Sequence, residues 1–185
     1  PLRLVGSEMC IRDRFGTLFM QAKEINQLVK SLGEQCQENA YHLVIAESCT
    51  GGMICSAITS VSGSSNWFDR GFITYSNQSK YDLLGVSKKT LDNYGAVSQN
   101  VANEMAKGAI KNSQANLSLS ITGVAGPDGG TKIKPVGTVY FAICSQNAIL
   151  FEGKLIFDGT RQAIQEKALL FALNNLLKLT LKQQI

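Results

Sequence analysis

The chain has 185 residues, of which 44% are hydrophobic and 17% are charged. This length and composition are typical of one globular domain with its own core, and extensive disorder is not expected. The formal net charge of +4 comes from scattered basic residues that form no cluster, which argues against nucleic acid as a partner. No apolar run approaches the roughly 20 residues that span a bilayer, so we expect no membrane association.

The cysteine and histidine content limits the chemistry available to the chain. The five cysteines are odd in number and form no C-x-x-C pair, which predicts reduced thiols in a cytoplasmic protein. His42 is the single histidine, so a histidine-rich metal site is excluded and a Ser-His-Asp triad would need His42 itself. His42 opens the apolar run "HLVIA", where it is typical of a strand edge. We expect neither a metal nor a cofactor.

The first 16 residues are set apart from the rest of the chain. The stretch "PLRLVGSEMCIRDR" follows neither the helical nor the strand period, so residues 1–16 are interpreted as an extension or a non-native leader to a domain over 17–185. In the first half of that domain the patterns predict, in chain order, a helix over 17–39, a strand over 42–48, a helix over 50–61, a strand over 70–76, a helix over 77–85 closed by Gly85, and a short helix within 86–98.

The second half of the chain continues the alternation of helices and strands. The patterns predict a helix over 98–115 with Ser98 as its N-cap, a strand over 117–123, a turn-rich loop over 124–137, two strands over 137–145 and 148–157 that form a hairpin, and a helix over 160–184. This order predicts an α/β fold, a three-layer α/β/α sandwich around a mixed, mostly parallel sheet. No internal repeat, linker or second domain is indicated.

Three predicted strand ends carry small, polar or glycine-rich sequence: "AESCTGG", "TYSNQSK" and "TGVAGPDGG". Ligands of open α/β sheets bind beyond the carboxyl ends of the strands, so we expect these segments to face one crevice. Ser48 lies at a strand-to-helix turn, where the N–H groups from Cys49 to Gly52 would be free to stabilise an oxyanion or an anionic ligand. The alternative is an ordinary helix start, with Ser48 or Thr50 as the N-cap and the glycines serving close packing.

A serine nucleophile needs a base, and with one histidine the next candidate is a lysine. Lys80 and Tyr75 follow the second strand and would approach Ser48 if that strand neighbours the first, since a desolvated lysine can accept the serine proton. The alternative is a solvated helix lysine. The "GPDGG" loop over 126–130 is either a phosphate- or ribose-binding turn or a mobile one. The residues that would supply positive charge to an anionic substrate, or lie on the surface, are Lys132, Lys134 and Arg161.

Together the segments resemble the CinA C-terminal domain family. The resemblance is carried from about residue 17 to the C-terminus by "AESCTGG", "GFITYSNQSKYDLLGV", "YGAVSQNVANEMAKGA", "SITGVAGPDGGTKIKPVGTVYFA" and "FDGTRQAIQEKAL". Enzymes of this family are nicotinamide-nucleotide amidohydrolases. The resemblance therefore implies a three-layer sandwich, a homo-oligomer, and hydrolysis of nicotinamide mononucleotide, a pyridine mononucleotide, to nicotinate mononucleotide and ammonia, a step of pyridine-nucleotide recycling.

The resemblance also implies roles for individual residues. Ser48 of the E-S-x-T-G-G motif is the nucleophile, Lys80 the base, Tyr75 an assisting group, and Thr122 a further member of the site. Cys49, the other candidate nucleophile, would contribute mainly its backbone N–H. The residues expected around the substrate are Glu47 (holding the ribose hydroxyls or orienting Lys80), Cys49, Thr50, Gly51, Gly52, Gly123, Gly126, Gly129, Gly130 and Arg161.

Two other functions stay open from the sequence. One is a catalytically silent, nucleotide-binding regulatory module of the same fold, against which the intact set Ser48, Tyr75, Lys80 and Thr122 argues. The other is a DNA-linked competence factor, against which the lack of a basic cluster argues. Ammonia release from nicotinamide mononucleotide and salt-dependent DNA binding separate the three.

Overall fold

A single five-stranded sheet organises the computed structural model, which describes residues 7–146 and 148–182, with side chains described from residue 22 onward. The strands lie in the order β2–β1–β3–β4–β5. Their bounds are β1 Leu43–Glu47, β2 Phe68–Ile73, β3 Leu117–Gly123, β4 Thr138–Ser145 and β5 Ile149–Ile156. β1 pairs in parallel with both β2 and β3, whereas β4 is antiparallel to both β3 and β5. β4 alone therefore runs against the other four strands, and the predicted mixed sheet is confirmed.

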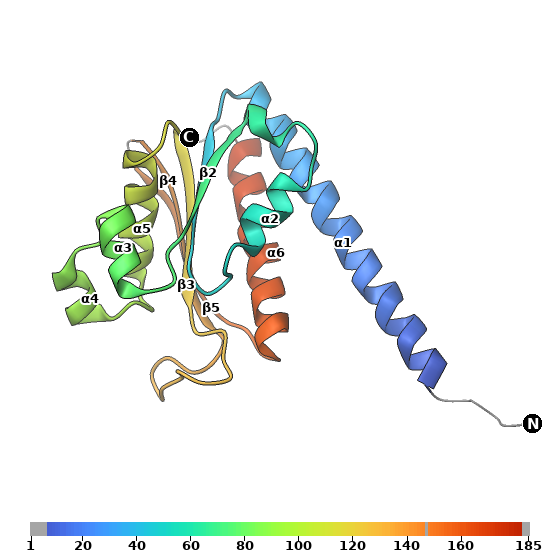
Figure 1. Ribbon diagram of the computed structural model, residues 1–185. Coiled ribbons are helices and arrows are strands. Elements are labelled where there is room, and N and C mark those ends of the chain that lie inside the picture. Colours follow the sequence, from blue (N-terminus) through green and yellow to red (C-terminus); the bar gives the residue numbers. More distant parts are fainter. Residues whose placement is uncertain (1–6, 147, 183–185) are drawn as a thin grey trace, which may run out of the picture.

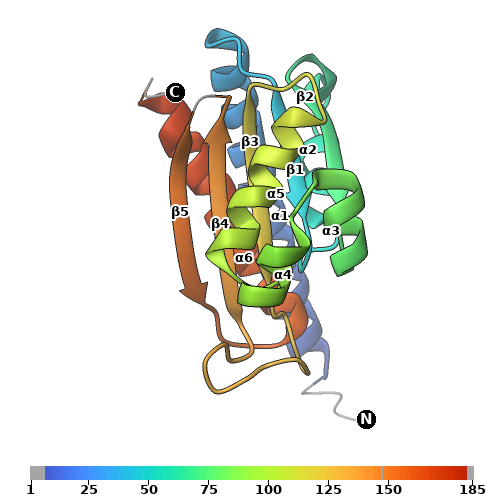
Figure 2. The same ribbon diagram turned by 90° about the vertical axis from the view of Figure 1, so that its left-hand side faces the viewer.

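Helices cover both faces of this sheet, as Figures 1 and 2 show. On one face lie α3 (Asn77–Leu84), α4 (Lys88–Tyr94) and α5 (Gln99–Lys111), and α5 packs over β3 and β4. On the other lie α1 (Ser7–Glu38), α2 (Met53–Thr59) and α6 (Arg161–Leu181). The predicted three-layer α/β/α sandwich is confirmed. Within the described part of the chain, no helix combines the length and apolarity that a bilayer crossing requires.

Several element bounds differ from the prediction. α1 begins at Ser7 and runs through the boundary set at residue 16, so part of the proposed extension is helical, while residues 1–6 lie outside the described residues. The predicted division into 1–16 and 17–185 stays a prediction. β2 covers Phe68–Ile73 instead of 70–76, because the chain leaves the sheet at Thr74 to enter α3. A short 3-10 helix, η1 (Ser64–Asn66), was not predicted.

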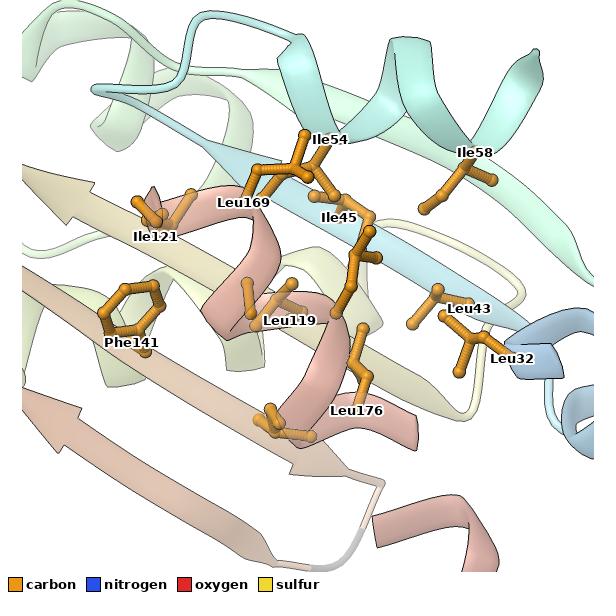
Figure 3. Close-up of a cluster of buried hydrophobic side chains, with 14 of the residues drawn as sticks. Leu32, Leu43, Ile45, Ile54, Ile58, Leu119, Ile121, Phe141, Leu169 and Leu176 are labelled. Atoms are coloured by element: carbon orange, nitrogen blue, oxygen red, sulfur yellow. The ribbon is translucent and has the colours of Figure 1, made fainter. Parts of the chain in front are cut away.

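The core explains why β1 is an unbroken apolar run. Leu43 and Ile45 belong to the cluster between the sheet and the α1, α2 and α6 layer, drawn in Figure 3. Val44 and Ala46 belong to the cluster beneath α3 and α5 on the opposite face. Successive residues of a strand point to opposite faces, so a central strand that is covered on both sides must be apolar at every position.

The helix that carries Lys80 is fixed at both ends. At the start of α3, the side chains of Ser76 and Ser79 form a reciprocal capping box with the backbone. At its end, Gly85 adopts a left-handed C-cap, as predicted. There α3 meets α5 at Gly108, where a Cβ atom would lie 1.9 Å from the backbone oxygen of Leu84.

We expect Gly108→Ala to destabilise the fold, because a backbone carbonyl cannot yield as a flexible side chain would. The free energy of unfolding should fall by at least about 2 kcal/mol, the usual scale of overpacking. Chemical denaturation monitored by circular dichroism measures the change. Lys107→Ala, an exposed neighbour on the same helix, is the control and should be close to neutral. Equal stability of the Gly108→Ala and wild-type proteins would contradict the prediction.

Candidate active site

The carboxyl ends of β1, β2 and β3 meet at one cavity of ≈ 280 Å³. Ser48 and Cys49 follow β1, Tyr75 and Lys80 follow β2, and the segment after β3 supplies a third wall. The predicted crevice is confirmed, because parallel neighbouring strands end at the same edge of a sheet. The lining residues are Ser48, Cys49, Tyr75, Lys80, Ala96, Val97, Thr122, Gly123, Val124, Ala125, Gly126, Asp128, Gly129 and Arg161.

Ser48 and Lys80 form the central contact of the cavity. The Lys80 Nζ donates a hydrogen bond to the Ser48 Oγ over 3.0 Å and another to the backbone oxygen of Thr74 over 2.7 Å. Lys80 is 1% exposed and Ser48 is 7% exposed. The interpretation of Lys80 as a solvated helix lysine is therefore wrong.

Burial lowers the pKa of the Lys80 amine from its usual 10.5 to about 8. The cause is desolvation, which penalises the ammonium more than the neutral amine. A neutral amine has a free lone pair, so near pH 8 this lysine can accept a proton from the hydroxyl that it contacts. Burial has the opposite consequence for the neighbouring thiol, since it raises the pKa of Cys49 to about 12. Cys49 thus remains a thiol at neutral pH, and Ser48 is the better-equipped nucleophile.

Glu47 stabilises the turn that carries Ser48. Its carboxylate is fully buried and accepts backbone N–H groups from Gly52 at 3.0 Å, Ile54 at 3.2 Å and Cys55 at 2.8 Å. These are donors of the first turn of α2, which a helix otherwise leaves unpaired. The structure thus gives Glu47 a different task from the expected ribose contact or orientation of Lys80.

The expected helix start also needs correction. The N-cap position of α2 is Gly52, which has φ 99° and no capping side chain, so neither Ser48 nor Thr50 is the N-cap. Of the four N–H groups expected to be free, that of Gly52 binds Glu47 and that of Gly51 donates to the Ser48 carbonyl over 3.1 Å. Among the described residues, no backbone or carboxylate oxygen accepts the N–H of Cys49 or Thr50. Only Cys49 of these two lines the cavity.

Arg161 connects two walls of the cavity. Its guanidinium donates to the backbone oxygen of Gly126 and to the Tyr75 hydroxyl, both over 2.8 Å. Thr122 is buried and donates its hydroxyl to the Ala96 carbonyl over 2.9 Å, which draws the segment before α5 against the site. Both residues line the cavity, and each also holds neighbouring backbone in place.

The glycine loop contributes unequally. Gly123, Gly126 and Gly129 line the cavity, and Gly126 and Gly129 have φ values of 80° and 86° that favour glycine. Four other residues that were expected around the substrate do not line the cavity. They are Thr50, Gly51, Gly52 and Gly130. Lys134 donates to the Tyr94 carbonyl over 2.7 Å and so anchors the loop, while Lys132 is exposed.

Sequence reasoning missed several groups around the cavity. Asp128 and Val97 line it, and Gln165 donates from α6 to the Cys49 carbonyl over 2.7 Å. The spacing of four residues between Arg161 and Gln165, which puts both on one face of a helix, was an available signal.

His42 lies just before β1, at the amino end of this strand and away from the cavity at its carboxyl end, as its strand-edge interpretation predicts. The described residues contain no cluster of histidine, cysteine or acidic side chains suited to a metal ion.

We expect Glu47→Gln to lower the free energy of unfolding by about 2 to 4 kcal/mol, because the amide would turn a donor toward backbone donors in a buried place. Urea denaturation measures the effect. Glu38→Gln is the matched control, since the Glu38 carboxylate is exposed and accepts a hydrogen bond from the nearby Gln35 side chain. It should change stability by less than about 0.5 kcal/mol. A Glu47→Gln protein as stable as this control would show that the buried cap is dispensable.

The sequence and the fold of this chain are similar to those of known proteins. A family model for the CinA C-terminal domain matches residues 25–180. The nicotinamide-nucleotide amidohydrolase PncC of Enterobacter agglomerans is 45% identical over 159 residues, covering 86% of this chain and 97% of its own. That of Escherichia coli K12 is 43% identical over 157 residues, covering 85% and 95%. The crystal structure of the competence/damage inducible protein CihA from Agrobacterium tumefaciens superposes with a TM-score of 0.80 at 41% identity, covering 84% and 94%. The chain belongs to the CinA C-terminal domain family.

Proposed function

We propose that the protein is an amidohydrolase that converts nicotinamide mononucleotide to nicotinate mononucleotide and ammonia. The observation that carries the proposal is the buried contact between the Lys80 Nζ and the Ser48 Oγ at 3.0 Å, in a cavity at the carboxyl ends of three parallel strands. The two PncC relatives described above match this chain over 97% and 95% of their own lengths and are named nicotinamide-nucleotide amidohydrolases, which supports this choice of substrate.

The first half of the proposed reaction forms an ester on Ser48. The neutral Lys80 amine takes the hydroxyl proton while the Ser48 oxygen attacks the carboxamide carbon, giving a tetrahedral oxyanion. The lysine then returns that proton to the amide nitrogen, the C–N bond breaks, and ammonia leaves. The bond from Lys80 to the Thr74 carbonyl supports this role, because it directs the amine at the serine.

The second half hydrolyses the ester. Water attacks the acyl carbon while Lys80 accepts one of its protons, and the collapse of the second tetrahedral oxyanion returns the proton to the Ser48 oxygen. The products are the free enzyme and a carboxylic acid, which loses the second proton of the water to solvent and becomes the nicotinate carboxylate. We assign the N–H of Cys49 to stabilise both oxyanions, since Cys49 lines the cavity beside the nucleophile and no oxygen of the described residues accepts this N–H.

The opposite wall of the cavity suits the rest of the nucleotide. Arg161 keeps further N–H donors beyond those that bind Gly126 and Tyr75, and a guanidinium is well matched to phosphate oxygens. The backbone of the loop at Gly126 and Gly129 adds donors to the same wall. We therefore propose Arg161 and this loop as the phosphate side of the site.

Removing the nucleophile should abolish the activity. For Ser48→Ala we expect loss of ammonia release by at least roughly 10⁴-fold, and for Lys80→Met by at least roughly 10²-fold, the scale of lost acid–base catalysis. A coupled ammonia assay with nicotinamide mononucleotide measures both. Cys49→Ala is the control and should keep most of the activity, because it leaves the backbone N–H in place.

Other outcomes of this assay would select another function. Full activity of the Ser48→Ala protein would overturn the serine mechanism. Nucleotide binding by the wild type without ammonia release would point to a non-catalytic regulatory module. DNA binding that weakens steeply with salt would point to a DNA-linked role.

The activity should follow the protonation of Lys80. Because burial lowers the pKa of this amine to about 8, its neutral form increases as the pH rises, and kcat/KM should rise through a midpoint near that value. An ordinary lysine would place the midpoint above pH 10. Initial rates between about pH 6 and about pH 10, with Cys49→Ala as the reference variant, test this. A profile that is flat across this range would exclude Lys80 as the base.

We also propose that the chain acts in the cytoplasm and as a homo-oligomer. The described cysteines Cys36, Cys49, Cys55 and Cys144 are unpaired, which suits a reducing compartment. Exposed apolar side chains such as Ile73 and Ile133 offer surface for self-association. Light scattering on the purified protein measures its assembly state.

A further inference from the structure

We propose that Gln165 is a positioning residue for the oxyanion donor of the Ser48 reaction, an inference that rests on the proposed function. Gln165 lies on α6, and its Nε2 donates over 2.7 Å to the backbone carbonyl of Cys49, the residue directly after the nucleophile. The two residues are 116 positions apart in the sequence. The bond therefore ties the C-terminal helix to the turn on which the reaction depends.

Gln165 completes a set of bonds that fixes both peptide planes around Cys49. The plane before Cys49 is held because the Ser48 carbonyl accepts the Gly51 N–H over 3.1 Å. The plane after it is held by the Gln165 amide. The N–H of Ser48 is also paired, with the Ile121 carbonyl at 3.0 Å. A peptide unit is planar, so these bonds leave the Cys49 N–H little freedom to rotate.

This restraint matters because an oxyanion donor acts through its orientation before the reaction starts. A donor that must turn toward the developing charge loses part of its benefit to reorganisation. The Cys49 N–H belongs to the Ser48–Cys49 peptide, whose carbonyl is held within the turn by the Gly51 N–H. Gln165 ties this turn to α6 through the next peptide, so its loss would let the turn shift relative to the helix. The Cys49 N–H would then point at the substrate oxygen for only part of the time.

The position of Gln165 on α6 supports this role. Arg161 precedes it by one helical turn and contacts Gly126 and Tyr75 from the same helix. One face of α6 thus fixes the nucleophile turn through Gln165 and the opposite wall through Arg161. Gln165 has a neutral amide and no contact with Lys80, so its loss should change the rate constant without moving the pH dependence.

The test compares Gln165→Met, which removes the donor at similar length, with Gln165→Lys, which restores one. Gln162→Met is the matched control, because Gln162 lies on the same helix and its side chain is exposed and donates to Glu166 over 2.8 Å. We expect Gln165→Met to lower kcat about tenfold, less than the loss of a whole oxyanion donor. KM and the pH midpoint should not change, Gln165→Lys should recover most of the rate, and Gln162→Met should match the wild type.

A second measurement separates this inference from the choice of substrate. A fluorophosphonate phosphonylates a reactive serine and places its phosphoryl oxygen where the oxyanion would lie, so Gln165→Met should also slow the labelling of Ser48 about tenfold. If the wild type releases no ammonia from nicotinamide mononucleotide, the proposed function fails and the labelling rates decide the inference. Wild-type kcat and labelling rate in Gln165→Met, or an equal loss in Gln165→Lys, would overturn it.

Discussion

The burial of Lys80 is the constraint on which the rest of the site depends. An amine that is 1% exposed has lost its water, so its protons go to the Thr74 carbonyl and the Ser48 hydroxyl. The same desolvation lowers its pKa, so that a neutral amine able to accept a proton is present near pH 8. Burial of Lys80 therefore explains both its hydrogen bonds and its lowered pKa. Because a lysine ammonium is better solvated in water, α3 must hold this side chain inside the protein. The capping box at Ser76 and the close contact at Gly108 provide that restraint.

The sequence was sufficient for the parts of the fold that follow local periodicity. The apolar run of β1 indicated a strand covered on both faces, and the polar ends of β1, β2 and β3 indicated a crevice at one edge of a sheet. Bringing Lys80 to Ser48 needed one further fact, the adjacency of β1 and β2, which was assumed for the prediction and which the parallel pairing supplies. The family resemblance pointed to the same pair.

The sequence was insufficient where a side chain binds backbone far from it in the chain or replaces a familiar cap. The motif around Ser48 contains two good N-cap residues, yet the helix start is stabilised by Glu47 from the strand before it. The spacing of Gln165 from Arg161 indicates a shared helix face, but the contact of Gln165 with Cys49 also depends on where α6 packs against the sheet, which local periodicity does not encode. β2 ends earlier than its β-branched residues suggest, because the chain leaves the sheet at Thr74 to enter α3, and the Thr74 carbonyl then accepts a hydrogen bond from Lys80.

Glu47 also has a consequence for turnover. The first turn of α2 would be an attractive place for any anion formed beside Ser48, since its N–H groups point toward the strand end. In the proposed reaction the product carries a carboxylate that the substrate lacks. Because Glu47 already accepts the N–H groups of Gly52, Ile54 and Cys55, these donors are not available to the new carboxylate. In the proposed reaction the Glu47 carboxylate would therefore keep this helix from retaining the product, and product release would not have to break a charged contact there.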